Sequence, residues 1–325
     1  MSTTNIIRDA RLGPAAGLDA PRSSESSVDR VNAAGWRDYY QLTKPTISML
    51  VVVTVVPSLL LAAGTAWPDA LVSAVALIGT WLAAASAAVF NQLIDSDIDS
   101  EMMRTRARPL PSGRISAPIA AALGALLGIA SFVLLYSLTT PLAAWVALAA
   151  NAFYVLVYTA WLKRRTVQNI VIGGAAGAVG PLIGWAAVTG DLAWPAWVLF
   201  AIICLWTPPH FWALALKYVK DYAAAGVPMM PVVRGEESTR WQMFVYTLTL
   251  IPAVASLTVF GVAGWTYFVL AMGMTIWFAV LAWRLYRSHA STSAMPLFHY
   301  SCFYLFGVFG ALTMDQLMLL VLGWS

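Results

Sequence analysis

Cysteine and charge are both scarce in this chain, and each scarcity narrows the class of protein. Only two cysteines, Cys204 and Cys302, occur among 325 residues, so neither a disulfide framework nor a thiolate metal site is indicated. Charged residues make up 10% of the chain and hydrophobic residues 60%, and the mean hydropathy is +0.74. Apolar runs of about 20 residues, the length that crosses a bilayer, recur along the sequence. We therefore predict a polytopic membrane protein.

The apolar runs predict an all-α bundle of about nine transmembrane helices. Their residues are continuously apolar and do not alternate with period two, which disfavours a transmembrane β-barrel. We expect residues 36–325 to form a single membrane domain. The predicted spans are residues 46–64, 71–91, 115–138, 141–162, 169–190, 192–216, 243–264, 267–283 and 297–324.

The positions of the basic residues predict the orientation of the bundle. All 19 Lys and Arg fall in the N-terminal segment, in the loops after the second, fourth and sixth spans, or at the end of the eighth. By the positive-inside rule, the N-terminus is cytoplasmic and the C-terminus lies outside. The pI near 9.1 reflects this topology, and because the bases are dispersed among short loops we expect no nucleic-acid partner.

The first 35 residues contain no apolar run and are rich in Ser, Ala, Asp and Arg, which predicts a disordered cytoplasmic tail. A secretory signal is not indicated, and the acids Asp9, Asp19, Glu25 and Asp29 argue against a mitochondrial transit peptide. We expect a bacterial inner (plasma) membrane protein, with the mitochondrial inner membrane as the less favoured alternative.

A cluster of acids and bases follows the second span. Asn91, Asp95 and Asp99 are spaced four residues apart, so on one helix they form a stripe of oxygen ligands, while Asp97 points elsewhere. Mg²⁺ prefers such an incomplete set of carboxylates, completed by phosphate oxygens. Arg104 and Arg108 then provide forked hydrogen bonds to a diphosphate. The alternative is a solvated helix end where these acids and bases only pair with one another.

A second polar segment ends the sixth span. Pro208 and Pro209 predict a break or kink in its helix, with freed carbonyls lining a cavity, and His210 follows directly. One open alternative is that His210 only forms a hydrogen bond that joins neighbouring helices. Another is that Lys217 and Asp221 form an interfacial ion pair.

A third polar segment joins the fourth and fifth spans, from Tyr158 through Lys163, Arg164 and Arg165 to Asn169. Two of its three bases are expected to serve only as stop-transfer charge. The span that follows contains small residues that favour close helix packing: Gly173, Gly174, Gly177 and Gly180.

These motifs resemble the UbiA superfamily of intramembrane prenyltransferases. The first Asp-rich motif of that superfamily is matched by Asn91-x-x-x-Asp95-x-x-x-Asp99 and Arg104-x-x-x-Arg108-Pro. A narrower resemblance, to the haem-modifying branch, is carried by Trp206-x-x-Pro-His210-Phe-Trp and by Asp221-Tyr-x-x-Ala-Gly-x-Pro-Met-x-Pro231. The likeness extends over residues 44–315.

The resemblance implies a nine-helix bundle around a central cavity with cytoplasmic cap loops. It implies transfer of farnesyl from farnesyl diphosphate to the vinyl group of haem b, giving haem O, in a lipid bilayer and before a downstream haem A synthase. The residues it assigns fall into three groups. Mg²⁺ would be held by Asn91, Asp95 and Asp99. The diphosphate and substrates would be met by Arg104, Arg108, Tyr158, Lys163, Asn169, Lys217 and Asp221. The haem-side residue would be His210, as axial ligand or proton shuttle.

The chain departs from the superfamily pattern at one motif, and two other functions remain as alternatives to haem farnesylation. Where many members carry a second Asp-x-x-x-Asp, this chain has Lys217-x-x-x-Asp221, so a second metal is not expected. A related prenyltransferase acting on an aromatic acid or quinone precursor is the nearer alternative, and a membrane transporter the more distant one. In the last span, His299 is an ionisable group of unassigned role, and Asp315 is expected to be structural.

Overall fold

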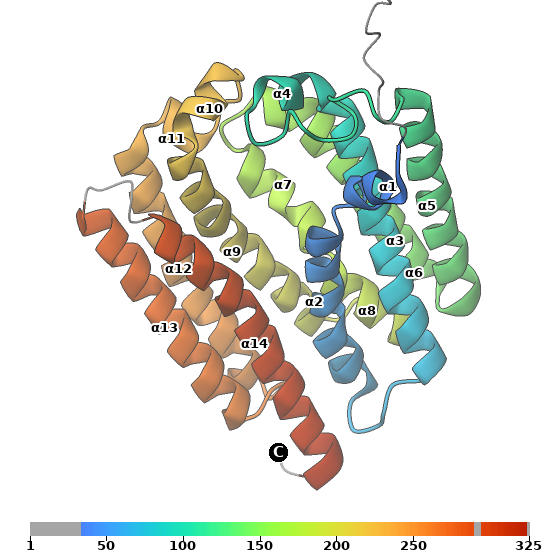
Figure 1. Cartoon of the computed structure of the whole chain (residues 1–325). Coiled ribbons are helices and arrows are strands. Elements are labelled where there is room, and N and C mark those ends of the chain that lie inside the picture. Colours follow the sequence, from blue (N-terminus) through green and yellow to red (C-terminus); the bar gives the residue numbers. More distant parts are fainter. Residues whose placement is uncertain (1–33, 289–293, 324–325) are drawn as a thin grey trace, which may run out of the picture. The chain divides into compact units, whose positions relative to one another are not determined.

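The computed structural model describes residues 34–288 and 294–323, and within these ranges the regular elements are all helices. The predicted tail therefore lies outside the described residues, apart from residues 34–35. Nine helices of the described part are long and apolar enough to cross a membrane, which confirms the predicted class (Figure 1). The seventh span begins at Glu236, two helical turns earlier than predicted, and the other spans match closely.

The helical elements follow one another with short connections. Their order is α1 (Trp36–Leu42), α2 (Pro45–Ala63), α3 (Ala70–Ile94), α4 (Ser96–Glu101), α5 (Ala117–Leu138), α6 (Pro141–Ala152), η1 (Phe153–Trp161), η2 (Leu162–Arg164), α7 (Asn169–Gly177), α8 (Gly180–Thr189), α9 (Trp194–Lys217), α10 (Val219–Ala224), α11 (Met230–Val233), α12 (Glu236–Val259), α13 (Trp265–Ser288) and α14 (Ala294–Leu322). The short helices α4, α10 and α11 lie at the same end of the bundle, where we expect the cytoplasmic caps (Figure 1).

Glycines set the closest helix contacts, as the sequence predicts. A Cβ added at Gly180 would lie 2.2 Å from the Thr54 hydroxyl, and one at Gly173 would lie 2.1 Å from the Tyr158 ring. Gly174 is similarly crowded by Thr207, whereas Gly177 has nothing within 4 Å. The first three therefore permit close packing, and Gly177 faces open space.

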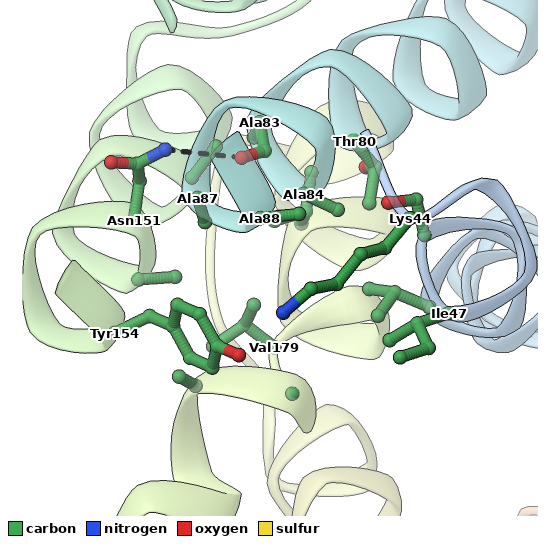
Figure 2. Close-up of a pocket in the computed structure, with 17 residues that line it drawn as sticks. Lys44, Ile47, Thr80, Ala83, Ala84, Ala87, Ala88, Asn151, Tyr154 and Val179 are labelled. Atoms are coloured by element: carbon green, nitrogen blue, oxygen red, sulfur yellow. Dashed lines mark hydrogen bonds between the residues drawn. The ribbon is translucent and has the colours of Figure 1, made fainter. Parts of the chain in front are cut away.

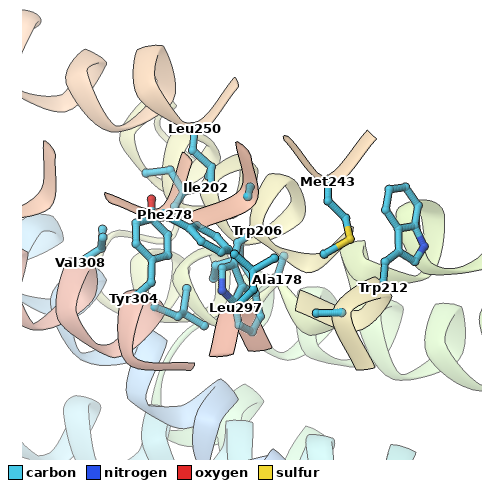
Figure 3. Packing of buried hydrophobic residues seen from close by; sticks show 14 of the residues in the cluster. Ala178, Ile202, Trp206, Trp212, Met243, Leu250, Phe278, Leu297, Tyr304 and Val308 are labelled. Atoms are coloured by element: carbon cyan, nitrogen blue, oxygen red, sulfur yellow. The ribbon is translucent and has the colours of Figure 1, made fainter. Parts of the chain in front are cut away.

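The two larger of three hydrophobic clusters in the described residues divide the bundle. The smaller, around α2, α3, α6 and α8, consists largely of alanine and valine. The larger core, around α9, α12, α13 and α14, contains large aromatic side chains, including Trp206, Phe278 and Tyr304 (Figure 3). We call these two regions the alanine side and the aromatic side.

Of the break or kink predicted at Pro208 and Pro209, the break is wrong, because α9 runs without interruption through both prolines. Each proline ring removes one helical hydrogen bond, yet packing against neighbouring helices sustains such sites in membrane proteins. Here the Trp206 indole N–H donates to the Ser301 carbonyl (2.8 Å), and the Thr207 hydroxyl donates to the Ile203 carbonyl (2.7 Å). The irregular backbone occurs instead at the π-helical η1 and between α7 and α8.

Candidate active site

Asn91, Asp95 and Asp99 form a buried group at the end of α3. The helix ends at Ile94, Asp95 links it to α4, and so the predicted single stripe is interrupted at its middle residue. The three side chains nevertheless gather, with 4%, 1% and 3% of their surface exposed. Asn91 Nδ2 donates to Asp95 Oδ2 (2.8 Å).

Two bases pair with these carboxylates. Lys163 Nζ lies 2.5 Å from Asp95 Oδ2, and an Arg108 guanidinium nitrogen lies 2.6 Å from Asp99 Oδ2. The acids and bases thus do pair with one another. Such pairing is what the alternative to a metal site predicts. The two carboxylates are buried, however, while their basic partners are partly exposed, and a buried charge is costly unless it has partners or a function.

Lys44 joins the same group and was missed from the sequence. Its Nζ donates to Asn91 Oδ1 (2.5 Å) from the N-cap of α2. Among the described non-glycine residues, Lys44 alone has a positive φ, at 44°, a backbone strain of the kind found at functional sites. Its position directly before Pro45 and the first span is the signal that could have found it. We call Lys44, Asn91, Asp95, Asp99, Arg108 and Lys163 the acid–base cluster.

The pKa of Lys44 is lowered to about 7, mainly by burial and also by the positive charges of Arg108 and Lys163, against the attraction of Asp99 and Asp95. The cluster therefore holds cationic groups close together in a desolvated site. An anion such as a diphosphate would offset this repulsion.

The donor set fits a divalent cation. Asp95 Oδ1 is buried and has no hydrogen-bond partner among the described residues. Together with the Asp99 carboxylate and the Asn91 amide oxygen, it offers the hard oxygen ligands that Mg²⁺ prefers. Among the described residues no three His, Cys, Asp or Glu side chains converge, so the donor set of this site is two carboxylates and one amide oxygen.

An apolar cavity of about 100 Å³ lies beside the acid–base cluster, between α2, α3, α6, α7 and α8. We call it the inner cavity. Figure 2 shows the Lys44 ammonium and the Tyr154 hydroxyl pointing into it from opposite sides. Its walls are mostly small side chains, and the alanines of α3 that line it are Ala83, Ala84, Ala87 and Ala88.

The π-helical segment η1 connects the cavity to the cluster. The Thr159 hydroxyl donates to the Tyr154 carbonyl (2.8 Å) and accepts from Asn91 Nδ2 (3.1 Å). The rings of Tyr154 and Tyr158 lie 5.2 Å apart, and Tyr158 packs on Gly173. π-Helices are frequent at functional sites. Neither η1 nor Thr159 was predicted, because a continuous apolar run does not distinguish π from α geometry.

Other predicted site residues lie at the rim. The Arg104 guanidinium and Lys217 Nζ both lie over the Tyr218 ring, at 5.9 and 5.4 Å from its centre. Burial raises the pKa of Tyr222, while the charge of Arg104 opposes that rise. Lys217 is exposed and Asp221 is half-buried, and the described residues contain no ion pair between them.

Asn169 begins α7 beneath the loop that precedes α11. Its Nδ2 donates to the Thr166 carbonyl (2.7 Å) and more weakly to the Pro228 carbonyl (3.4 Å), while its Oδ1 is buried without a partner in the described structure. This contact ties the loop after α10 to the segment that follows Lys163.

Arg164 binds Asp97, which is not a member of the acid–base cluster. Its two terminal nitrogens meet the Asp97 carboxylate at 2.7 Å each, and one also donates to the Ile94 carbonyl (2.9 Å). The same Arg164 hydrogen bonds hold the pKa of Asp97 below its usual value. Lys163 and Arg164 thus both have specific partners, which differs from the expectation that two of the three bases are only stop-transfer charge.

His210 lies apart from the acid–base cluster, on the aromatic side. Its Nδ1 meets the Ser301 hydroxyl (2.6 Å), and its ring stacks between Trp206 and Phe298, at centroid distances of 4.4 and 4.8 Å. These partners come from α9 and α14. In the described structure His210 is not in the lining of the inner cavity. His299 is exposed.

Asp315 has a structural role, as the sequence predicts. Its carboxylate accepts hydrogen bonds from the backbone N–H groups of Gly264 (2.7 Å) and Tyr267 (3.2 Å). It thereby satisfies backbone donors at the start of α13.

The fold and the family match define an intramembrane prenyltransferase. The model of the UbiA prenyltransferase family matches residues 51–308, and the chain belongs to that family. A solved digeranylgeranylglyceryl phosphate synthase superposes with a TM-score of 0.72 at 19% identity, over 86% of this chain and 98% of that one. A UbiA homologue from Archaeoglobus fulgidus, bound to DMAPP and Mg²⁺, gives a TM-score of 0.65 at 15% identity, over 85% and 99%. At these identities the likeness shows the fold.

Relatives with similar sequences are described more specifically than as members of the UbiA family. The protoheme IX farnesyltransferase of Gloeobacter violaceus is 49% identical over 297 residues, covering 91% of this chain and 97% of the relative. That of Deinococcus radiodurans is 44% identical over 305 residues, covering 90% and 97%. The family membership disfavours the transporter alternative.

Proposed function

We propose that this protein transfers a farnesyl group from farnesyl diphosphate to a vinyl group of protohaem IX (haem b), giving haem O. The similarity to protoheme IX farnesyltransferases extends over nearly the whole chain and supports this acceptor. The observation that carries the donor assignment is Asp95. It is a buried carboxylate, next to Lys163 and beside an apolar cavity, and one of its oxygens has no hydrogen-bond partner in the described part of the chain.

Donor binding follows from the arrangement of charge. Asn91, Asp95 and Asp99 would hold Mg²⁺, which when bound neutralises developing charge on the diphosphate. Lys44, Arg108 and Lys163 would contact the remaining diphosphate oxygens. Preorganised charges at a leaving group, in a site from which water is excluded, are a large source of rate enhancement.

The other assigned residues would act around this centre. Arg104 and Lys217 would attract the diphosphate at the cytoplasmic rim, with Asp221 beside them. Tyr158 would pack against the first isoprene unit, and the unpartnered Asn169 Oδ1 would orient a group in the site. These roles are proposals for residues whose positions are described above.

The reaction balances as an addition to the vinyl group. The bond between C1 of the farnesyl group and the diphosphate oxygen breaks, and its electron pair leaves with the diphosphate. The terminal vinyl carbon of the haem then bonds to C1, which places positive charge on the inner vinyl carbon. Water adds there and releases a proton, giving the hydroxyethylfarnesyl group. The apolar inner cavity keeps water away from the allylic cation before that addition.

His210 is the proposed haem-side residue, as an axial ligand of the iron or as a proton shuttle. Its Nδ1 is held by Ser301, and the described residues supply no hydrogen-bond partner to its Nε2. The ring is thereby held in one orientation between Trp206 and Phe298. We further propose that the protein resides in a bacterial plasma membrane with its N-terminus in the cytoplasm, and that it passes haem O to a haem A synthase.

The test is mass spectrometry of haems extracted after membranes carrying this protein are incubated with haem b, farnesyl diphosphate and Mg²⁺. An aromatic acid and a quinone precursor are offered in parallel incubations. We expect haem O, and its loss when EDTA is added. Farnesylation of an aromatic acceptor without any haem product would overturn the proposed acceptor.

A further inference from the structure

A second cavity shares a wall with the inner cavity. This outer cavity, of about 200 Å³, lies between α3, α5 and α6. Ile129 and Leu148 line it and are 63% and 40% exposed, so it opens toward the lipid-facing surface. The residues that line both cavities are Ala83, Ala147 and Asn151.

Asn151 supplies the barrier in that shared wall. Its Nδ2 donates to the Ala83 carbonyl (3.0 Å) and so joins α6 to α3 (Figure 2). Ala83 and Ala147 carry only methyl groups, so the amide of Asn151 is the longest side chain among the three. Without it, small side chains alone would separate the two cavities.

The shared wall lies deep relative to the acid–base cluster. Ala83 precedes Asn91 by eight residues on α3, which places it about 12 Å farther along the helix axis. A diphosphate held at the cluster would therefore direct its isoprenoid tail along the inner cavity toward Asn151.

The outer cavity has the chemistry to take a further isoprene unit. The Ser86 hydroxyl donates to the Gly124 carbonyl (2.8 Å), and the Ser131 hydroxyl donates to the Gly79 carbonyl (2.7 Å). The two serines in its lining are therefore already satisfied. An apolar chain entering there would strand neither hydroxyl.

We propose that Asn151 determines the length of the isoprenoid donor, by closing the inner cavity against the outer one. This inference rests on the proposed function, because it concerns the tail of that function's donor. The wild-type protein accepts the farnesyl chain and rejects the geranylgeranyl chain, which is one isoprene unit longer. Shortening residue 151 joins the cavities and admits the longer chain.

The experiment is a competition between equal concentrations of farnesyl and geranylgeranyl diphosphate, with haem b and Mg²⁺, using the full chain in lipid nanodiscs. Mass spectrometry measures the ratio of the two haem products. The wild type should give mainly the farnesyl product. Asn151→Ala should raise the geranylgeranyl share about tenfold or more, the discrimination that hydrophobic pockets provide for a small difference in size. Asn151→Ser, which is also shorter, should shift the ratio in the same direction and serves if the alanine variant does not fold.

A filled outer cavity is the matched control. Ala125 lines only that cavity, so Ala125→Leu alone should leave the product ratio unchanged, and added to Asn151→Ala it should restore the wild-type ratio. Wild-type ratios in both shortened variants, or equal use of the two donors by the wild type, would overturn the role of Asn151 while leaving haem farnesylation intact. Absence of any haem product from the wild type would instead overturn the proposed function.

Discussion

Asp95 and Asp315 are both nearly buried aspartates in a membrane protein, yet their surroundings differ. Both Asp315 oxygens accept hydrogen bonds from backbone N–H groups at the start of α13. Asp95 Oδ2 meets Lys163, whereas its Oδ1 has no hydrogen-bond partner among residues 34–288 and 294–323. The first arrangement stabilises a helix end and is complete. The second is incomplete without a ligand, and that difference separates a structural acid from a candidate catalytic one.

The same contrast extends to the two sides of the bundle. On the alanine side, small residues of α3 and α6 leave the inner cavity open beside the charges. On the aromatic side, large rings fill the space, and the described residues there line neither of the two cavities. The fully buried aromatic residues of that side are Trp212, Tyr267, Phe278, Tyr304 and Phe309.

The largest expected effect comes from exchanging each of the two acids for its amide. Asp95→Asn should reduce turnover about 10²–10³-fold, because one preorganised charge at the leaving group is lost. Asp315→Asn should retain turnover per folded molecule and instead lose about 1–3 kcal/mol of unfolding free energy, since buried N–H groups lose charged acceptors. Turnover assays combined with thermal unfolding separate the two. Similar turnover in both variants would remove the distinction.

The two lysines give a second comparison. Lys163→Met should reduce turnover about 10²-fold, since this lysine contacts Asp95 in a buried site. Lys217→Met should change turnover by about fivefold at most, because exposed charges are screened by solvent. Steady-state kinetics at two salt concentrations checks this. An equal loss in both variants would show that the rim takes part in the chemical step.

Two alanine substitutions contrast the open and filled sides. Ala87→Leu should fit into the inner cavity without loss of stability and should raise the KM for farnesyl diphosphate about tenfold. Ala213 is fully buried in the aromatic core, and Ala213→Leu should destabilise the fold by about 1–3 kcal/mol through overpacking. Thermal unfolding and donor titrations measure both. Destabilisation by Ala87→Leu would contradict an open cavity.

The smallest effect concerns pH. Arg164 holds the pKa of Asp97 below the ordinary value of 3.8, so its stabilising contribution is complete above that value and is lost as the pH falls through the lowered pKa. Asp97→Asn should therefore reduce the loss of stability below about pH 4, with no change near pH 7 beyond a small constant offset. Unfolding midpoints between pH 3 and 6 test this. An identical acid profile in the wild type and variant would show that the pair contributes nothing.

Local features of the site were accessible from the sequence. The four-residue spacing of Asn91, Asp95 and Asp99 places them together even though α3 ends between them, since helical backbone hydrogen bonds link Asp95 to Asn91 (3.0 Å) and Asp99 to Asp95 (2.8 Å). The spans followed from hydropathy, because a bilayer requires long apolar helices. These features depend on neighbouring residues, which a sequence displays directly.

Features that depend on contacts between distant segments were missed or wrongly predicted. Lys44 reaches Asn91 across 47 residues, and Thr159 reaches it across 68. The helix through Pro208 and Pro209 is continuous and makes a contact with α14 through Trp206, which the local rule for proline does not include. The same packing places His210 among aromatic rings, away from the acid–base cluster.

Metal binding at Asp95 is the most direct test of the account. Mn²⁺ substitutes for Mg²⁺ at oxygen sites and is visible by electron paramagnetic resonance. In the presence of a non-hydrolysable farnesyl diphosphate analogue, the wild type and Asp315→Asn should bind Mn²⁺, and folded Asp95→Asn should not. Equal Mn²⁺ binding by folded Asp95→Asn and the wild type would contradict the claim that the acid–base cluster holds a metal-bound diphosphate.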